Sequence, residues 1–217
     1  MILAGHILAG DRLLEKPGLK IDAATVLRTR GPTDHYVSRG AHKLLGALNH
    51  FKIQLDGKVC LDVGASTGGF TQVCLERGAV KVFAVDVGHN QLHWKIRNDK
   101  RVISMEGVNV REAPSSMLPE LVDFICIDTS FISLKLILPS VLKFLKPTGD
   151  IVALIKPQHE VGKELVGKGG IVRDPVQHRQ VTQDISQFVQ TIGLNVSGLI
   201  ESPITGTTGI IEFLIHG

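Results

Sequence analysis

From about residue 36 onward, the chain alternates short apolar runs with stretches whose apolar residues recur at helical spacing. Uninterrupted apolar runs are typical of strands buried on both faces, and their alternation with helices predicts a doubly wound, mostly parallel sheet. The expected strands are Val59–Val63, Val80–Val85, Arg101–Met105, Leu121–Ile127 and Ile151–Ile155. The expected helices are His35–Phe51, Phe70–Arg77, Gln91–Asn98, Leu134–Leu145 and Pro175–Ile192.

Further local signals complete this α/β prediction. Ser38 is a suitable N-cap for the first helix. Lys146–Gly149 has the composition of a turn between a helix and the fifth strand. Leu194–Glu201 and Gly209–Ile215 are apolar enough to close the sheet as an antiparallel pair. We therefore expect a Rossmann-like sheet that is mostly parallel, with an antiparallel last strand pair.

The residues after the first expected strand form a glycine-rich turn. The strand carries an acid at Asp62, and a helical run begins near Phe70. Small residues let the backbone approach a ligand closely, and the N–H groups at a helix start are free to donate. The second strand ends at Asp86, where a carboxylate is well placed to accept hydrogen bonds from ribose hydroxyls. The two signals together favour a nucleotide-like cofactor over a ligand-free strand–turn–helix.

The turn fits neither common phosphate-binding motif. No lysine follows Gly68 or Gly69, as a phosphate loop requires, and the spacing of Gly64, Gly68 and Gly69 differs from the dinucleotide fingerprint. An acid at Asp62 would repel a pyrophosphate, whereas it suits a cationic ligand. S-adenosylmethionine carries a sulfonium and an amine at the corresponding end, so it is the cofactor we expect.

Polar residues follow successive strands of the expected sheet. Ligands of such sheets bind beyond the carboxyl ends of the strands, where polar residues contact them. Strands also end at polar residues for solvation alone, so either explanation fits an individual residue. The residues at these ends are Asp62, Gly64, Asp86, Asn109, Asp128 and Lys156.

Lys156 is the residue best suited to act as a base. A lysine that is partly desolvated and near other cations loses affinity for its proton. Lys43 could supply the neighbouring positive charge, with Asp128 holding both lysines in place. Glu212 lies within the last apolar run, where it either has a partner or faces solvent on an edge strand.

Composition narrows the picture only slightly. The chain has 217 residues, is 43% hydrophobic and carries a net charge of +3, so global charge does not indicate nucleic-acid binding. It contains no run of 18 apolar residues and no signal-peptide pattern. Three cysteines without a CxxC spacing indicate buried free thiols in a reducing compartment, which favours the cytoplasm, and no metal site is expected.

Residues 1–35 differ from the rest of the chain. They hold too few apolar residues for an independent core, and Gly31–Asp34 has the composition of a linker. We therefore expect two parts, an appendage at 1–35 and the main domain at 36–217. Basic residues in the first turns of the helix that follows are disfavoured by the helix dipole, and from this segment alone a solvated basic face explains them better than a function does.

Several motifs together resemble the TlyA/hemolysin A family of FtsJ-like ribosomal RNA 2′-O-methyltransferases. The resemblance covers about residues 36–217. Its motifs are Tyr36–Gly40, Asp62–Phe70, Ala84–Gly88, Ser130–Leu134, Lys156–Gly162 and Gly167–Pro175. It implies a Rossmann-like methyltransferase fold, S-adenosylmethionine as methyl donor, and ribosomal RNA or a ribosomal subunit as partner, with methylation of a ribose hydroxyl, expected on cytidine. It also implies that residues 1–35 correspond to the second half of an RNA-binding segment of the ribosomal αL type, including the Lys16–Pro17–Gly18 step.

The resemblance assigns roles to individual residues. The catalytic tetrad it implies is Lys43, Asp128, Lys156 and Glu212. The expected cofactor contacts are Asp62, Gly64, Ala65, Ser66, Thr67, Gly68, Gly69, Phe70, Asp86, Val87, Asn109 and Asp128. The expected phosphate contacts are Arg39, His42, Lys163, Lys168 and Arg173. Two alternatives compete with this interpretation: an inactive relative that still binds cofactor or RNA, and a membrane-active hemolysin, for which no apolar membrane segment is visible.

Overall fold

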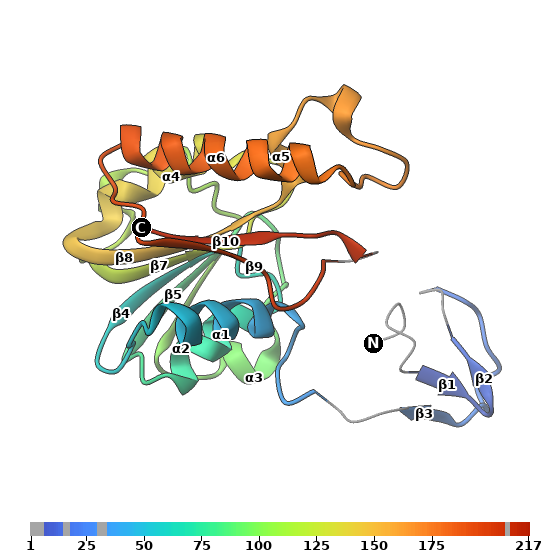
Figure 1. The fold of residues 1–217 in the computed structure, drawn as a ribbon. Helices are drawn as coiled ribbons and strands as arrows, with labels where there is room; N and C mark the ends of the chain where they lie inside the picture. Colours follow the sequence, from blue (N-terminus) through green and yellow to red (C-terminus); the bar gives the residue numbers. More distant parts are fainter. Residues whose placement is uncertain (1–6, 15–17, 30–33, 207–208) are drawn as a thin grey trace. The chain divides into compact units, whose positions relative to one another are not determined.

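The computed structural model describes residues 7–14, 18–29, 34–206 and 209–217, in two compact units, Met1–His35 and Tyr36–Gly217. The first unit holds a small antiparallel sheet in the order β2-β1-β3 (Figure 1). Its strands are β1 (Ile7–Ala9), β2 (Arg12–Leu13) and β3 (Leu27–Thr29). Residues 15–17 and 30–33, which cover most of the expected Lys16–Gly18 step and Gly31–Asp34 linker, lie outside the described residues.

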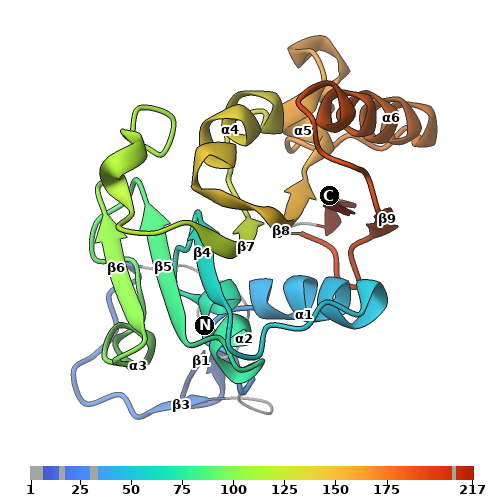
Figure 2. The same ribbon diagram turned by 90° about the vertical axis from the view of Figure 1, so that its left-hand side faces the viewer.

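The second unit is built on a seven-stranded sheet in the order β6-β5-β4-β7-β8-β10-β9, with β6 at one edge and β9 at the other (Figure 2). All pairs from β6 to β8 are parallel, and β10 is antiparallel to both of its neighbours. The predicted fold class is therefore confirmed. The strands are β4 (Val59–Val63), β5 (Lys81–Asp86), β6 (Val102–Glu106), β7 (Val122–Ile127), β8 (Leu145–Ile155), β9 (Gly198–Glu201) and β10 (Phe213–His216).

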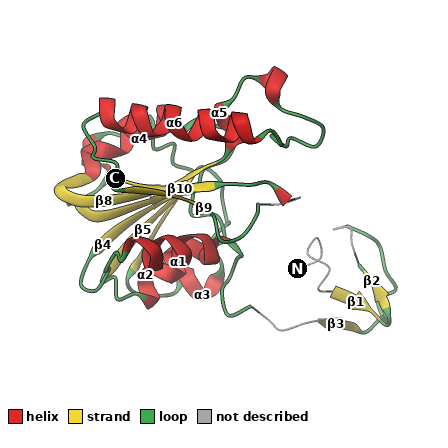
Figure 3. Ribbon diagram, in the orientation of Figure 1, coloured by secondary structure: helices red, strands yellow, loops and turns green. Residues whose placement is uncertain are grey.

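Helices cover both faces of this sheet (Figure 3). On one face lie α1 (Gly40–Phe51), α2 (Gly69–Glu76) and α3 (Trp94–Arg97). On the other lie α4 (Leu134–Val141), α5 (Pro157–Glu160) and α6 (Pro175–Thr191). Short 3-10 turns occupy η1 (Ser115–Met117), η2 (Leu142–Phe144) and η3 (Lys163–Leu165). Asp174 caps α6 by accepting a hydrogen bond from Val176 N.

The central strands are buried on both faces because alternate side chains enter two different cores. Val59, Leu61 and Val63 of β4 pack in the cluster that includes the apolar residues of α4 and α6. Cys60, between them, packs with the apolar residues of α1 and α2. Side chains of a strand point alternately to opposite faces, so an uninterrupted apolar run satisfies both layers at once.

One predicted boundary around the fifth strand was wrong. Helical structure continues from α4 through η2 to Phe144, one residue short of the expected end at Leu145, but the expected turn at Lys146–Gly149 lies within β8. The pairing of β7 with β8 moves from Val122–Leu145 to Phe124–Asp150, so the intervening residues of β8 form a bulge. A bulge keeps the strand in the sheet while accommodating turn-forming residues.

The start of α1 and the length of α3 also differ from prediction. Arg39, not Ser38, occupies the N-cap position of α1, and no side chain caps that helix. The helix expected from Gln91 begins only at Trp94. Its expected first turn is not helical because the N–H groups of Asn90, Gln91 and Leu92 bond to a carboxylate of β6 instead.

The three cysteines, Cys60, Cys74 and Cys126, are buried and free, as predicted. Burial raises the pKa of the Cys126 thiol to about 12. None of the helices in the described residues is long and apolar enough to span a membrane.

Candidate active site

The strand order brings the predicted site residues to one edge of the sheet. Asp86 ends β5, Gly64 follows β4, Asp128 follows β7 and Lys156 follows β8. These four strands are neighbours in the order β5-β4-β7-β8 and run parallel, so their carboxyl ends share one edge. Residues separated by up to 92 positions in the sequence thus border one region.

The glycine turn after β4 is held close to its neighbours. The φ angle of Gly64 is +83°, and a Cβ at that position would collide with the carbonyl oxygen of Asp128. Gly68 has φ +96° and leaves room for the side chains of Leu92 and Ile96. Only glycine adopts this left-handed conformation without strain while the backbone packs so closely. The start of α2 lies directly after this turn, and its first residues, Gly69 and Phe70, are buried.

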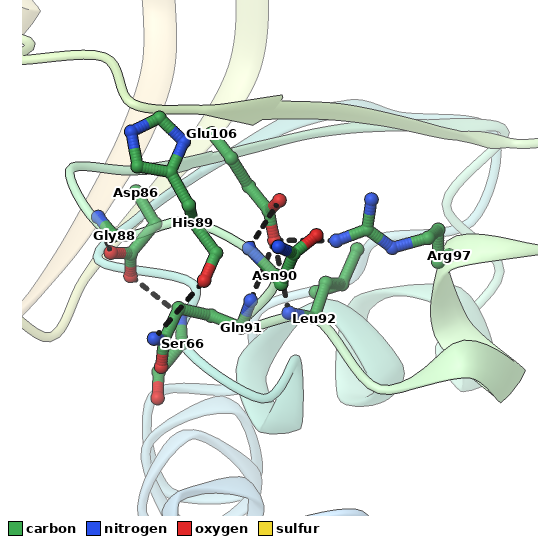
Figure 4. Close-up of polar contacts among 9 residues, drawn as sticks. All are labelled: Ser66, Asp86, Gly88, His89, Asn90, Gln91, Leu92, Arg97 and Glu106. Carbon is green, nitrogen blue, oxygen red and sulfur yellow. Dashed lines mark hydrogen bonds and ion pairs between the residues drawn. The ribbon is translucent and has the colours of Figure 1, made fainter.

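Asp86 is organised as a hydrogen-bond acceptor (Figure 4). Its Oδ2 accepts a hydrogen bond from Ser66 N at 2.8 Å, and its Oδ1 accepts one from Gly88 N at 2.7 Å. An ionised carboxylate offers about four acceptor positions, so each oxygen keeps one for a ligand. The next residue, Val87, is an apolar side chain that is 70% exposed. The pair offers an acceptor for hydroxyls beside a free apolar surface.

Glu106 is a residue that sequence reasoning missed (Figure 4). At the end of β6 it accepts hydrogen bonds from the backbone of Asn90, Gln91 and Leu92 at 2.9 to 3.1 Å and from Arg97 at 2.6 Å. The bond from Arg97 and those from the backbone lower the pKa of Glu106 to about 2. Glu106 therefore orders the loop between Asp86 and α3. The available signal was an acid directly after an apolar strand.

Asn109, which was expected at the end of this strand, lies three residues beyond it. Its Nδ2 donates to Glu112 Oε1 at 2.8 Å, and its Oδ1 accepts from Arg111 N at 3.2 Å. The sequence predicted that the strand itself ends at Met105, one residue early, and took Asn109 rather than Glu106 as the polar residue that follows it. A role for Asn109 in cofactor binding stays a prediction.

Asp62 lies beneath the glycine turn and is fully buried. Its Oδ2 accepts a hydrogen bond from the Thr71 hydroxyl at 2.6 Å, and its Oδ1 has no hydrogen-bond partner among the described residues. Burial raises the pKa of Asp62 to about 7, against the opposing effect of the Thr71 bond. In this structure the carboxyl group supports the turn from within.

The raised pKa of Asp62 predicts a stability that falls with rising pH. The unfolded state releases this proton near pH 4, whereas the folded state holds it until about pH 7, so folding is progressively opposed between these values. Relative to Asp62→Asn, the wild-type protein should lose about 2 to 3 kcal/mol of unfolding free energy between about pH 5 and about pH 8. Urea unfolding of both proteins at the two pH values measures this difference. An equal pH dependence in both would contradict the assignment.

Lys156 lies in a polar pair with Asp128. The distance from Lys156 Nζ to Asp128 Oδ1 is 2.6 Å, and the lysine side chain is only 10% exposed. The same Nζ donates a hydrogen bond to Ser130 Oγ at 2.8 Å. The amine is therefore shielded from bulk water, and its two partners both lie in the loop after β7.

Lys43 and Glu212 form the second pair. Lys43 Nζ lies 2.5 Å from Glu212 Oε2, and the two side chains are 11% and 4% exposed. Glu212 comes directly before β10, which lies between β8 and β9, so the alternative of a solvent-facing glutamate on an edge strand is excluded. The expectation that Asp128 holds both lysines was wrong, because Lys43 pairs with Glu212.

The basic residues expected to bind phosphates have different surroundings. Arg39 is exposed and donates a hydrogen bond to Thr205 O at 2.9 Å, and the ring of His42 meets that of Tyr36 edge-on. Arg173 is exposed and donates to Lys168 O at 3.4 Å. The Lys163 side chain lies outside the described part of the structure. Their role in RNA binding stays a prediction.

Phe131 is a second feature that the sequence did not single out. Its ring is 94% exposed, and its φ angle of +65° is unusual for a bulky residue. The ring lies near His159, with centroids 5.4 Å apart. Burial, and then the charge of Lys156, lower the pKa of His159. An exposed ring in a strained backbone conformation one residue from Ser130 does not serve folding.

Among the described residues, no group of three histidine, cysteine, aspartate or glutamate side chains could hold a metal ion. The polar groups at the sheet edge are instead two lysine–carboxylate pairs and the acceptor Asp86, beside the glycine turn. Together with the strand order, this set defines the class of Rossmann-like methyltransferases.

The chain belongs to the FtsJ-like methyltransferase family, whose model matches residues 36–217. It is 41% identical to a Mycobacterium tuberculosis protein named 16S/23S rRNA (cytidine-2′-O)-methyltransferase TlyA, over 99% of this chain and 81% of the relative. It is 43% identical to Hemolysin A of Brachyspira hyodysenteriae, over 83% of this chain and 76% of the relative. A solved structure from Streptococcus thermophilus, described as a candidate hemolysin, matches with a TM-score of 0.84 at 47% identity, covering 99% of this chain and 79% of its own. The resemblance inferred from the sequence motifs is confirmed.

Proposed function

We propose that the protein transfers a methyl group from S-adenosylmethionine to a ribose 2′-hydroxyl of ribosomal RNA, with cytidine as the target nucleoside. The observation that carries this proposal is the pair formed by Lys156 and Asp128 at the edge that also holds the Asp86 acceptor. The Mycobacterium tuberculosis relative, named for cytidine 2′-O-methylation, supports the choice of reaction and substrate.

The residues at the sheet edge fit S-adenosylmethionine. Asp86 keeps acceptor positions suited to ribose hydroxyls, and Val87 offers an exposed apolar surface suited to a base. Gly64 and Gly68 keep the backbone of the turn free of Cβ atoms where it packs most closely. We assign the ring-bearing end of the cofactor to Asp86 and Val87 and the remainder to the turn 64–70. When bound, the cofactor supplies a methyl group already activated by its sulfonium.

The protein's own task is then to deprotonate and orient the ribose hydroxyl. Lys156, neutral at the moment of reaction, accepts the hydroxyl proton on Nζ, and Asp128 holds the lysine in place at 2.6 Å. The Lys43–Glu212 ion pair lies beside β8, because Glu212 directly precedes β10, which pairs with β8. Low exposure excludes water from both amines, which strengthens these electrostatic interactions.

Basic and aromatic residues of the second unit suit an RNA partner. We assign contacts with phosphates to Arg39, His42, Lys163, Lys168 and Arg173, and contact with an unpaired base to the ring of Phe131. Aromatic rings stack on bases irrespective of base identity, and basic side chains make binding weaker as salt increases. We assign an auxiliary RNA-binding role to residues 1–35, and a protein acting on ribosomal RNA would work in the cytoplasm.

The experiment is a methyl-transfer assay with tritiated S-adenosylmethionine on ribosomal subunits and on protein-free ribosomal RNA. We expect label in RNA, resistant to alkaline cleavage at the modified nucleotide because its 2′-oxygen is blocked. Label in protein, or none at all, would contradict the proposal. Absence of label, with cofactor binding retained, would favour the alternative that the protein is an inactive member of the family. Lysis of erythrocytes without RNA methylation would favour the hemolysin reading that the name of the Brachyspira relative suggests.

A further inference from the structure

The hydrogen bond from Lys156 to Ser130 has no role in the mechanism above. Lys156 Nζ has three positions beyond its bond to carbon. Nζ forms an ion pair with Asp128 Oδ1 at 2.6 Å and donates a hydrogen bond to Ser130 Oγ at 2.8 Å. The ion pair and the hydrogen bond together leave the third position for a substrate. An amine that accepts a proton must present its lone pair in that direction, because proton transfer requires close, aligned approach.

Asp128 alone does not fix this direction. A single contact leaves the amine free to rotate about its bond to carbon, and two contacts from different directions remove that freedom. Asp128 and Ser130 lie two residues apart in the loop that follows β7, so this one loop sets both contacts. The orientation of the third position therefore depends on the position of Ser130 in this loop.

The loop that carries Ser130 is tied to the segment that carries Lys156. Glu160 of α5 accepts a hydrogen bond from the Ser133 hydroxyl at 2.6 Å and one from Leu134 N at 2.8 Å. These bonds fix the far end of the loop to the turn that begins one residue after Lys156. The relative position of Ser130 and Lys156 is thus set at both ends, independently of their own hydrogen bond.

Ser130 is placed where its hydroxyl contributes little to folding. Its side chain lies at an exposed position, so water can take the place of its hydroxyl if it is removed. Substitutions at exposed positions change stability little. A mobile water, however, does not hold the amine in one orientation. The exposed hydroxyl is therefore explained by the reaction better than by stability.

We propose that Ser130 is a positioning residue for the reaction: with Asp128 it orients the Lys156 amine so that its one remaining position faces the ribose hydroxyl. This inference rests on the proposed function, in which Lys156 is the base. Ser130 itself exchanges no proton with the substrate, and the bonds made and broken are those of the methyl transfer already described.

The first test is the rate of hydrogen exchange of the Lys156 ammonium group, measured by NMR on the full chain labelled with ¹⁵N-lysine. The Lys156 signal is assigned by its loss in Lys156→Arg. We expect Ser130→Ala to speed this exchange several-fold and Ser130→Thr, which keeps the hydroxyl, to restore it. Ser116→Ala, an exposed serine of η1, is the matched control and should change nothing. Unchanged exchange in Ser130→Ala would overturn the inference.

The second test is the methyl-transfer assay on ribosomal subunits. We expect Ser130→Ala to lower kcat about tenfold or more, with KM for RNA and Kd for S-adenosylmethionine changed by less than about twofold, and Ser130→Thr to recover most of kcat. A kcat for Ser130→Ala equal to that of the wild type would overturn the role of Ser130 while leaving the proposed function intact. A wild-type protein without transfer to RNA would overturn the proposed function, and the exchange experiment would still decide whether Ser130 orients the amine.

Discussion

Lys156→Ala should lower the rate of methyl transfer to ribosomal RNA about 10³-fold while S-adenosylmethionine still binds, because the loss of a positioned general base typically costs 10²- to 10⁴-fold. The cofactor turn lies after β4 and the Asp86 acceptor at the end of β5, so neither contains the deleted amine. Single-turnover transfer of a tritiated methyl group measures the chemical step, and calorimetric titration measures cofactor affinity.

Lys100→Ala is the matched control for this experiment. Lys100 is an exposed lysine that precedes β6 and lies outside the proposed site. This variant should transfer the methyl group at the wild-type rate. Retention of transfer in Lys156→Ala would remove Lys156 from the role of base, even if the protein still methylated RNA.

The second large effect concerns the buried pair formed by Lys43 and Glu212. Glu212→Leu should destabilise the protein by about 3 to 5 kcal/mol, because it leaves a buried ammonium without its carboxylate. The side chains of the pair are 11% and 4% exposed, so water does not replace the lost partner readily. Urea unfolding of the wild-type and variant proteins measures the change in the free energy of unfolding.

A double variant separates folding from chemistry at this pair. In Lys43→Met/Glu212→Leu, two apolar side chains of similar size replace the two charges, and most of the lost stability should return, because buried ion pairs are often no better than well-packed apolar residues. Methyl transfer should nevertheless stay low. A double variant that is stable and fully active would show that the pair has only a structural role.

Much of the fold could be predicted because the deciding forces are local in the sequence. The apolar runs of β4, β5 and β7 are long enough to be buried on both faces, and that requirement alone identifies buried strands. Asp86 was located as a strand-end acid for the same reason. The family could be inferred because its motifs lie in the turns that follow these strands.

Where prediction failed, contacts distant in sequence outweighed local preference. The turn-like residues Lys146–Gly149 lie in β8 because pairing with β7 resumes beyond them. The first turn expected for α3 is absent because Glu106 of β6 takes its N–H groups. In both places a neighbouring strand supplied hydrogen bonds that the local sequence could not reveal.

The sequence alone determined which side chains were available at the sheet edge: two lysines, two carboxylates and an acceptor aspartate, in the turns where a methyltransferase of this family carries them. Only the tertiary structure decided how they pair. Lys156 forms an ion pair with Asp128 and a hydrogen bond with Ser130, and Lys43 forms an ion pair with Glu212. Pairing depends on distances of 2.5 to 2.8 Å between atoms on different strands and loops. Such distances follow from strand order and register, which no stretch of the sequence specifies by itself.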